Sequence, residues 1–210
     1  MKFISIDLFS GAGGLTSGLN ESGFQTILAS DFDKQISDTF QKNFKNVKFL
    51  CEDIKRINFL DIKKEMGLKN NELDLIVGGP PCQGFSMANR KRIEDDPRNL
   101  LFRNFYNAVK ILKPKCFLIE NVTGLQSEDI ALRTKQQPTT HAIANYFKSI
   151  DYEIKFLTFR SEESGIPQFR RRVLIIGTNI SKKKELLKLG QIGNLEGKYK
   201  SYESLKNENY

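Results

Sequence analysis

The sequence predicts an α/β fold built around a mostly parallel sheet of seven strands. Short apolar runs alternate along the chain with stretches in which apolar residues recur at helical spacing, a pattern typical of strand–helix–strand units. The last two apolar runs are joined by residues 160–171 alone, which leaves no room for a crossover helix, so these strands are predicted to be antiparallel. A chain of 210 residues is long enough to bury a substantial core.

Strands are predicted where short apolar runs are bounded by polar residues or glycine. In chain order they are Lys2–Phe9, Gln25–Phe32, Val47–Glu52, Leu73–Val77, Cys116–Glu120, Tyr152–Phe159 and Arg172–Thr178. Helices are predicted at Gly13–Ser22, Asp33–Asn43, Phe59–Gly67, Arg98–Leu112 and His141–Ile150. The fourth helix has a clear apolar face, formed by Leu101, Phe105, Ala108, Val109 and Leu112.

The remaining segments carry weaker patterns. Residues 127–140 are predicted to be irregular, and Pro138 interrupts them. From about Ile180 onward the chain is rich in lysine, asparagine and glycine and shows little periodicity. We therefore expect one folded domain over residues 1–180, followed by a basic, polar tail or linker over residues 181–210.

Composition narrows the class of protein. The chain has 33 basic and 25 acidic residues, and its net charge of +8 favours anionic partners such as nucleic acid or an anionic membrane surface. Three cysteines without paired spacing indicate neither a disulfide framework nor a zinc site, and no metal is expected. No apolar run approaches the ~20 residues of a membrane span, so we expect a soluble cytoplasmic protein with reduced thiols.

A glycine-rich turn follows the first strand and opens the first helix, in the segment Asp7-Leu8-Phe9-Ser10-Gly11-Ala12-Gly13-Gly14-Leu15. Glycines let a ligand approach the backbone, and a helix N-terminus offers free N–H groups and a positive dipole end. The third glycine of the dinucleotide fingerprint is replaced by Thr16, which disfavours NAD and hence an NAD-dependent oxidoreductase. A tight turn without a ligand remains the alternative.

Acidic residues stand at the ends of the next two strands. Asp31 follows the glycine turn by about twenty residues, where a carboxylate can accept hydrogen bonds from ribose hydroxyls. Phe32 beside it is suited to pack on an adenine ring, and Asp53-Ile54 is predicted to border the same pocket. Each of these residues also has a plain structural interpretation, as a solvated strand end or as part of the core.

A rigid cysteine turn follows the fourth strand, in the segment Gly78-Gly79-Pro80-Pro81-Cys82-Gln83-Gly84-Phe85-Ser86. Ligand clefts in open α/β sheets lie at the carboxyl ends of strands, which places Cys82 well for chemistry. Two prolines stiffen the approach and the flanking glycines permit an unusual turn, so Cys82 is predicted to be a nucleophile. Cys51 and Cys116 lie within apolar strand runs and are interpreted as structural.

Together these segments resemble the cytosine-C5 DNA methyltransferases. The resemblance rests on the glycine turn, on Pro80-Pro81-Cys82-Gln83, and on two further motifs in the family's order: Glu120-Asn121-Val122 and Gln168-Phe169-Arg170-Arg171-Arg172. Residues 96–102 resemble the segment that enters the family's middle helix, and the likeness spans residues 3–178. It implies a Rossmann-like methyltransferase fold that binds S-adenosyl-L-methionine and releases S-adenosyl-L-homocysteine.

The resemblance also implies the roles of individual residues. Cys82 would attack C6 of cytosine, Glu120 would hydrogen-bond N3 and the exocyclic amine, Arg172 would hold O2, and Arg170 would support the same wall. The residues expected to contact the cofactor are Phe9, Gly11, Gly13, Gly14, Leu15, Asp31, Phe32, Asp53, Ile54, Pro80 and Leu100.

The expected partner is double-stranded DNA, with the target base flipped out of the helix; methyltransferases are among the known base-flipping enzymes. The segment from Ser86 to Arg103 corresponds to a loop that closes over the substrate in the family, and its cations suit phosphate contacts. The residues expected to contact DNA are Gln83, Ser86, Arg90, Lys91, Arg92 and Arg98. A solvated loop is the alternative.

Full-length members of that family continue past the arginine motif into a target-recognition region and C-terminal motifs that this sequence does not show. The chain is therefore expected to be a split enzyme with a second chain, a truncated one or a degenerate one, and the intact catalytic positions favour the first two. The functions still to be separated by experiment are methylation of DNA, methylation of tRNA, and binding of DNA without catalysis. A restriction–modification role, the commonest bacterial setting of the family, is an expectation by analogy.

Overall fold

The computed structural model describes residues 3–81, 97–122 and 139–183, apart from the side chains of residues 97–100 and 139–142. All seven predicted strands and all five predicted helices are present, with ends within two residues of those expected. Short 3-10 turns are labelled η. The elements are β1 (Phe3–Leu8), α1 (Gly14–Glu21), β2 (Phe24–Asp31), α2 (Lys34–Asn43), β3 (Lys48–Cys51), η1 (Ile54–Arg56), α3 (Phe59–Glu65), β4 (Leu75–Gly78), α4 (Pro97–Leu112), β5 (Cys116–Asn121), α6 (Thr139–Lys148), β6 (Tyr152–Arg160), η4 (Ser161–Ser164), β7 (Arg171–Asn179) and η5 (Ile180–Lys182).

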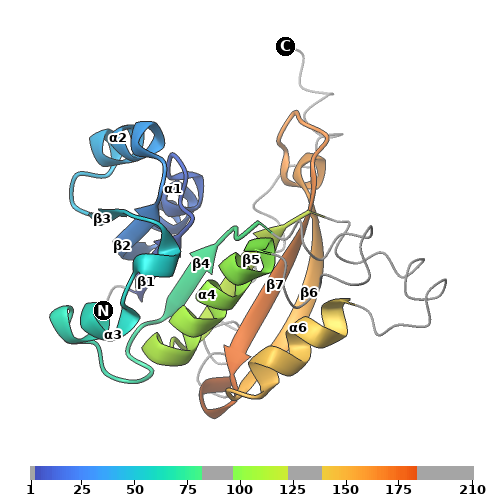
Figure 1. The fold of residues 1–210 in the computed structure, drawn as a ribbon. Coiled ribbons are helices and arrows are strands. Elements are labelled where there is room, and N and C mark those ends of the chain that lie inside the picture. Colours follow the sequence, from blue (N-terminus) through green and yellow to red (C-terminus); the bar gives the residue numbers. More distant parts are fainter. Residues whose placement is uncertain (1–2, 82–96, 123–138, 184–210) are drawn as a thin grey trace.

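The strands form one sheet in the order β3-β2-β1-β4-β5-β7-β6 (Figure 1). The pairs β1–β2, β1–β4, β2–β3 and β4–β5 are parallel, while β7 is antiparallel to both β5 and β6. This confirms the predicted mostly parallel sheet with an antiparallel C-terminal strand. The strand order reverses between β1 and β4, and ligands of open α/β sheets bind outside the carboxyl ends of the strands at such a point.

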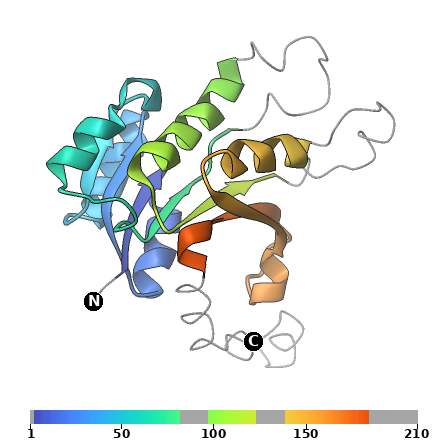
Figure 2. The same ribbon diagram turned by 90° about the horizontal axis from the view of Figure 1, so that it is seen from below.

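The helices are divided between the two faces of the sheet. Figure 2 shows α3, α4 and α6 on one side and α1 on the other, as right-handed crossovers on either side of the reversal require. Buried residues of α3, α4 and α6 form one hydrophobic cluster with the strands. Among the residues that the structure describes, no helix is both long and apolar enough to cross a membrane.

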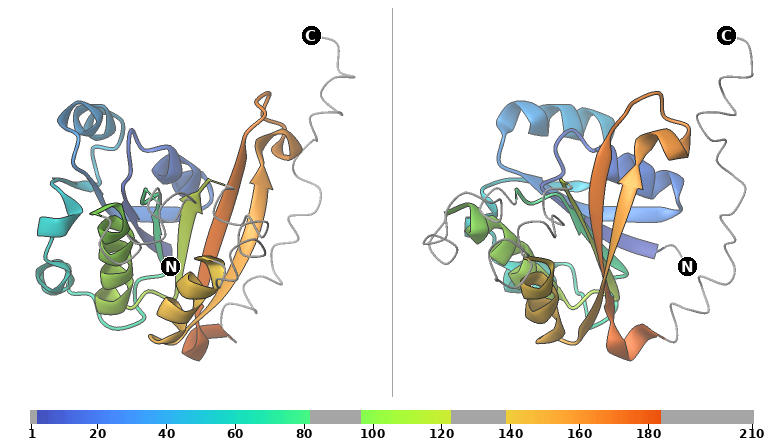
Figure 3. Two further views of the ribbon diagram at one scale, coloured as in Figure 1. Left: turned by 45° about the vertical axis from the view of Figure 1, so that its right-hand side comes forward. Right: turned by 90° about the vertical axis from the view of Figure 1, so that its right-hand side faces the viewer.

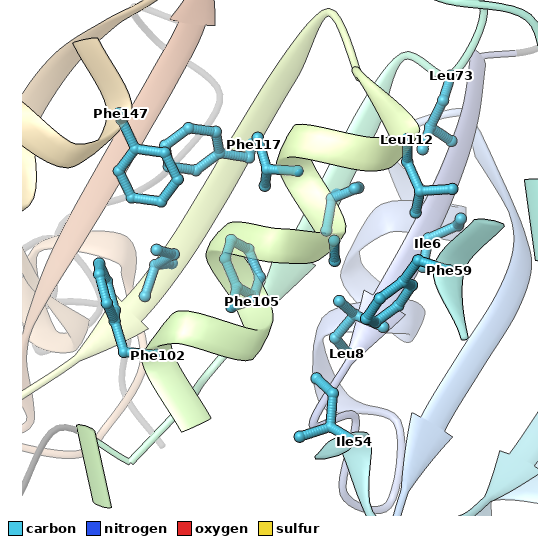
Figure 4. Packing of buried hydrophobic residues seen from close by; sticks show 14 of the residues in the cluster. Ile6, Leu8, Ile54, Phe59, Leu73, Phe102, Phe105, Leu112, Phe117 and Phe147 are labelled. Atoms are coloured by element: carbon cyan, nitrogen blue, oxygen red, sulfur yellow. The ribbon is translucent and has the colours of Figure 1, made fainter. Parts of the chain in front are cut away.

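Aromatic rings fill the centre of this cluster (Figure 4). Phe105 of α4 is fully buried and meets Phe117 of β5 edge to face, at 6.0 Å between ring centroids. Phe117 in turn contacts Phe147 of α6, with centroids 4.2 Å apart. Gly177 of β7 lies against the ring of Phe117, and a Cβ added at Gly177 would come within 2.0 Å of that ring. The packing fixes β5 and β7 side by side, and the carboxyl end of β5 carries Glu120.

Candidate active site

The glycine turn lies at the carboxyl end of β1 and adopts a left-handed backbone. Phe9, Gly11 and Gly13 have φ values of 60°, 55° and 98°. Gly13 is the N-cap of α1, and a Cβ there would lie 2.2 Å from the ring of Phe44, so glycine is required both by conformation and by packing. A Cβ at Gly11 or Gly14 would meet no atom of the described residues within 4 Å, so these residues leave open space along the backbone of the turn.

Asp31, at the carboxyl end of β2, holds this turn in place. One carboxylate oxygen accepts a hydrogen bond from the backbone N–H of Gly11 at 3.0 Å, and the other accepts one from the N–H of Asp33 at 3.1 Å. The carboxylate is only partly buried, and each oxygen keeps acceptor capacity for a further donor. The structure thus brings Gly11 and Asp31 together at the carboxyl ends of β1 and β2.

The other residues of the expected cofactor site are distributed around this pair. The ring of Phe32 is 75% exposed beside Asp31, and Leu15 is half-buried in α1. The β2–β3 pairing brings the end of β3 alongside, and Asp53 caps η1 through the N–H of Lys55. Ile54 is only 6% exposed and belongs to the hydrophobic cluster, so its side chain packs in the core.

A buried carboxyl lies beneath the glycine turn. Asp7 of β1 is fully buried; Thr16 of α1 donates its hydroxyl to one carboxyl oxygen at 2.7 Å, while the other oxygen has no hydrogen-bond partner among the described residues. Burial raises the pKa of Asp7 from its ordinary 3.8 to about 7, although the side-chain and backbone hydrogen bonds of Thr16 oppose the rise; the nearby charge of Asp31 adds to it. Gly13, the N-cap residue of α1, has no side chain that could accept a hydrogen bond from the first turn of the helix. The carboxyl of Asp7 in β1 takes this role, because it accepts hydrogen bonds from the backbone N–H and the hydroxyl of Thr16.

A carboxylate held by arginines lies at the carboxyl end of β5. Arg172 donates its Nε–H to Oε1 of Glu120 at 2.6 Å, and an Nη of Arg170 lies 3.9 Å from the same oxygen. Oε2 faces Gly79, where a Cβ would lie 3.4 Å from it. The side chain of Glu120 is 33% exposed. The three predicted catalytic residues that the structure describes are therefore in contact, with one carboxylate edge left accessible.

The residue after Glu120 fixes the entry to the cysteine turn. Asn121 is buried and donates its side-chain N–H to the carbonyl oxygen of Pro80 at 3.0 Å, while its own side-chain oxygen accepts from the N–H of Val122. Pro80 is thereby held beside the end of β5. Cys82 lies two residues further along the chain, outside the described residues.

Other predicted residues are also outside the described part of the chain. These are Gln83, Ser86, Arg90, Lys91 and Arg92, and the side chains of Arg98 and Leu100 in the first turn of α4. Among the described residues, the sequence interpretation missed two roles, the Asp7–Thr16 pair and the Asn121–Pro80 bond. A signal existed for each: a carboxylate within an apolar strand, and an amide at the end of the strand that neighbours the cysteine turn.

Comparisons with known proteins agree with this arrangement. A family model of the C-5 cytosine-specific DNA methylases matches residues 3–209. The Type II methyltransferase M1.HphI of Haemophilus parahaemolyticus is 34% identical over 179 residues, which cover 84% of this chain and 46% of that protein. The Type II methyltransferase M.AquIA of Picosynechococcus is 35% identical over 179 residues, 84% of this chain and 72% of that protein.

A solved structure gives the same result. The crystal structure of a protein described as a DNA modification methyltransferase encoded within an Escherichia coli prophage matches with a TM-score of 0.71 and 35% sequence identity, covering 86% of this chain and 48% of that one. The chain thus spans about half the length of most relatives it matches, and M.AquIA is itself a shorter protein.

Proposed function

The chain belongs to the C-5 cytosine-specific DNA methylase family, and on that basis we propose that it transfers a methyl group from S-adenosylmethionine to C5 of a flipped-out cytosine in DNA. The observation that carries the proposal is the contact of Glu120 with Arg170 and Arg172 at the end of β5, beside the Pro80 turn that leads to Cys82. The Type II methyltransferases among its relatives support a role in restriction–modification.

The residues present at the glycine turn fit S-adenosylmethionine. The open backbone at Gly11 and Gly14 admits a ligand, Asp31 retains acceptor capacity for ribose hydroxyls, and the exposed ring of Phe32 offers a face for adenine. When bound, the cofactor supplies an electrophilic methyl group, and the chain's own residues hold it at the reversal of strand order.

In the proposed mechanism, the reactive carbon of cytosine must first be activated. C5 is a poor nucleophile while the ring is aromatic, and addition of the Cys82 thiolate at C6 makes it enamine-like. Glu120 accepts from the exocyclic amine and passes a proton to N3 as the thiolate adds, while Arg172 fixes both Glu120 and O2 of the base. C5 then takes the methyl group. Loss of the proton at C5, elimination of the Cys82 thiolate and return of the N3 proton to Glu120 restore the aromatic ring.

Replacing Glu120 with glutamine tests this role. The amide retains the size of the side chain but loses the charge that pairs with Arg172, so we expect kcat to fall by roughly 10²- to 10³-fold, the cost of removing a transition-state contact. The measurement is single-turnover methyl transfer at saturating DNA. Glu153→Gln is the matched control, because Glu153 forms a comparable ion pair with Lys183 near the other end of the sheet. Equal losses in both variants would contradict the assignment.

Target recognition is proposed to come from outside the described domain. The chain spans 46% of M1.HphI and 48% of the prophage methyltransferase, so those relatives carry further sequence that has no counterpart in it. It spans 72% of M.AquIA, which is a shorter protein. Reconstitution with a second chain tests whether such a part is needed.

The experiment that tests the proposed function is transfer of a labelled methyl group from S-adenosylmethionine by the purified chain. Mixed-sequence duplex DNA and tRNA are offered in parallel, with and without the protein encoded by the neighbouring reading frame. Label in DNA alone is the expected result. Label in tRNA would replace DNA as the substrate, and no label in either, even with the second protein added, would favour a binding module without catalysis.

A further inference from the structure

The end of the β6–β7 hairpin, residues 160–171, carries an exposed aromatic ring that the proposed reaction does not use. Phe169 is 83% exposed, and among the described residues only Phe32, assigned above to the cofactor, approaches this value. Ile166 of the same hairpin end is 45% exposed. A lone exposed apolar side chain is common on protein surfaces, so the surroundings of Phe169 decide whether it has a role.

Those surroundings are strongly basic. Arg160 and Arg171 are directly opposite partners in the antiparallel β6–β7 ladder, and both are exposed. Like charges directly opposite each other on one face of a sheet repel. Arg160 is compensated by Glu163 at 3.2 Å, whereas no described residue offers Arg171 a carboxylate. A bound anion would relieve this repulsion.

The hairpin end is also held in one conformation. Ser161 donates both its N–H and its hydroxyl to the carbonyl of Arg170, at 3.0 and 3.2 Å, and its own carbonyl accepts from the N–H of Ile166. Gly165 provides the left-handed residue that closes the turn, with φ of 77°. A surface ordered in advance loses little conformational entropy when it binds a partner.

The position of this surface links it to the active site. Arg170 and Arg172, which contact Glu120, are chain neighbours of Phe169 and Arg171. Successive side chains of a strand point to opposite faces, so Arg171 and its partner Arg160 lie on the face of the hairpin opposite to Arg172, and the two faces meet at the hairpin end. Arg172 also donates to the carbonyl of Arg171 at 2.8 Å. Figure 3 shows the hairpin extending beyond the carboxyl ends of the central strands, where the candidate active site lies. A molecule bound at Glu120 that extends several nucleotides along the same edge would reach it.

We propose that this hairpin end is a DNA-contact surface, in which Phe169 packs on a base or deoxyribose beside the target cytosine while Arg160 and Arg171 contact backbone phosphates. An exposed ring between arginines is the combination that nucleic-acid-binding proteins use, because rings stack on bases and guanidinium groups pair with phosphates. The inference rests on the proposed function, since it takes DNA to be the substrate.

The test is equilibrium binding of duplex DNA to the purified chain, measured by fluorescence anisotropy over a series of salt concentrations and alongside methyl transfer. Phe169→Ala is expected to weaken binding by roughly 5- to 100-fold, the order found when a stacking ring is removed. Phe169→Trp is expected to retain affinity, while Phe169→Leu is not, because leucine is apolar but cannot stack. Arg160→Gln with Arg171→Gln is expected to reduce the slope of log K against log salt by about 1 for each phosphate that the protein no longer neutralises.

The control variants remove the same kinds of side chain, positive charges and an exposed apolar group, at a distance from the hairpin end. Lys110→Gln with Lys113→Gln takes two charges from the other end of the sheet, and Leu60→Ala removes an exposed apolar side chain of α3. Unchanged binding in the hairpin variants, or equal losses in the controls, overturns the inference, even if the wild-type chain methylates DNA. If the hairpin variants bind DNA more weakly than the wild-type chain, but the wild-type chain does not methylate DNA, the inference is supported and the proposed activity is contradicted. A wild-type chain that binds no DNA at any salt concentration overturns both.

Discussion

Replacing Cys82 with alanine is expected to abolish methyl transfer. The thiolate is the one group in the proposed mechanism that forms a covalent bond to the base, and without it C5 remains part of an aromatic ring that does not attack the methyl donor. Removal of a covalent nucleophile lowers turnover by roughly 10⁶-fold in a well-studied protease, and a loss of that order takes the rate below detection. Incorporation of labelled methyl groups into DNA is the measurement.

Cys51→Ala is the matched control for this variant. Cys51 is an exposed free thiol at the end of β3, on the side of the sheet assigned to the cofactor, and it has no part in the mechanism. Its loss is expected to leave turnover unchanged. An oligonucleotide containing 5-fluorocytosine gives a second readout: fluorine cannot leave C5 as a proton does, so the wild-type chain and the Cys51 variant should remain covalently attached. A Cys82→Ala chain that still forms the adduct would disprove the assigned nucleophile.

The second large effect concerns the pH dependence of stability and arises from Asp7. Its pKa of about 7 in the folded chain lies above the ordinary 3.8 expected after unfolding. Well below pH 3.8 both states are protonated and the full stability is present. Between about pH 4 and 7 the folded state binds one more proton, so its free energy of unfolding falls as pH rises, by about 4 kcal/mol in all. Above pH 7 this contribution stays lost.

Asp7→Asn removes the titrating group with little change in shape. We expect the variant to gain stability relative to the wild-type chain by about 4 kcal/mol as pH rises from 4 to 8, because only the wild-type chain carries the cost of a buried carboxylate. Urea denaturation across that range measures the difference. Asp38→Asn, on an exposed position of α2, controls for the loss of one negative charge. A difference between wild type and Asp7→Asn that is the same at every pH would contradict the raised pKa.

Ionised Asp7, beneath the glycine turn, thus lowers the free energy of unfolding of the wild-type chain. Asp7 caps α1 through Thr16 in place of the side-chain cap that Gly13 cannot offer. Its second oxygen is buried and receives no hydrogen bond from the part of the chain that the structure describes. A buried charge of this kind is expensive unless another charge meets it. This cost is the reason that the free energy of unfolding of the wild-type chain is expected to fall as Asp7 ionises.

The elements of the fold could be predicted from the sequence because their signals are local. The apolar face of α4 and the short strand runs depend on residues a few positions apart, and the predicted ends lie within two residues of those observed. The glycine turn and the short connection 160–171 were likewise readable in the chain itself. The motifs that contain Glu120 and the two arginines Arg170 and Arg172 are each contiguous in the chain as well, but only the resemblance to the family predicts that they share one site.

The tertiary structure determined the features that depend on contacts between residues far apart in the chain. β7 lies between β5 and β6, and this insertion brings Arg172 to within 2.6 Å of Glu120, 52 positions away in the chain. The bond from Asn121 to Pro80 spans 41 positions. Desolvation by the whole fold raises the pKa of Asp7, and the side chain of Ile54 packs in the core. Local pattern specifies elements and motif residues, but burial and pairing are properties of the assembled sheet, so only the folded chain determines them.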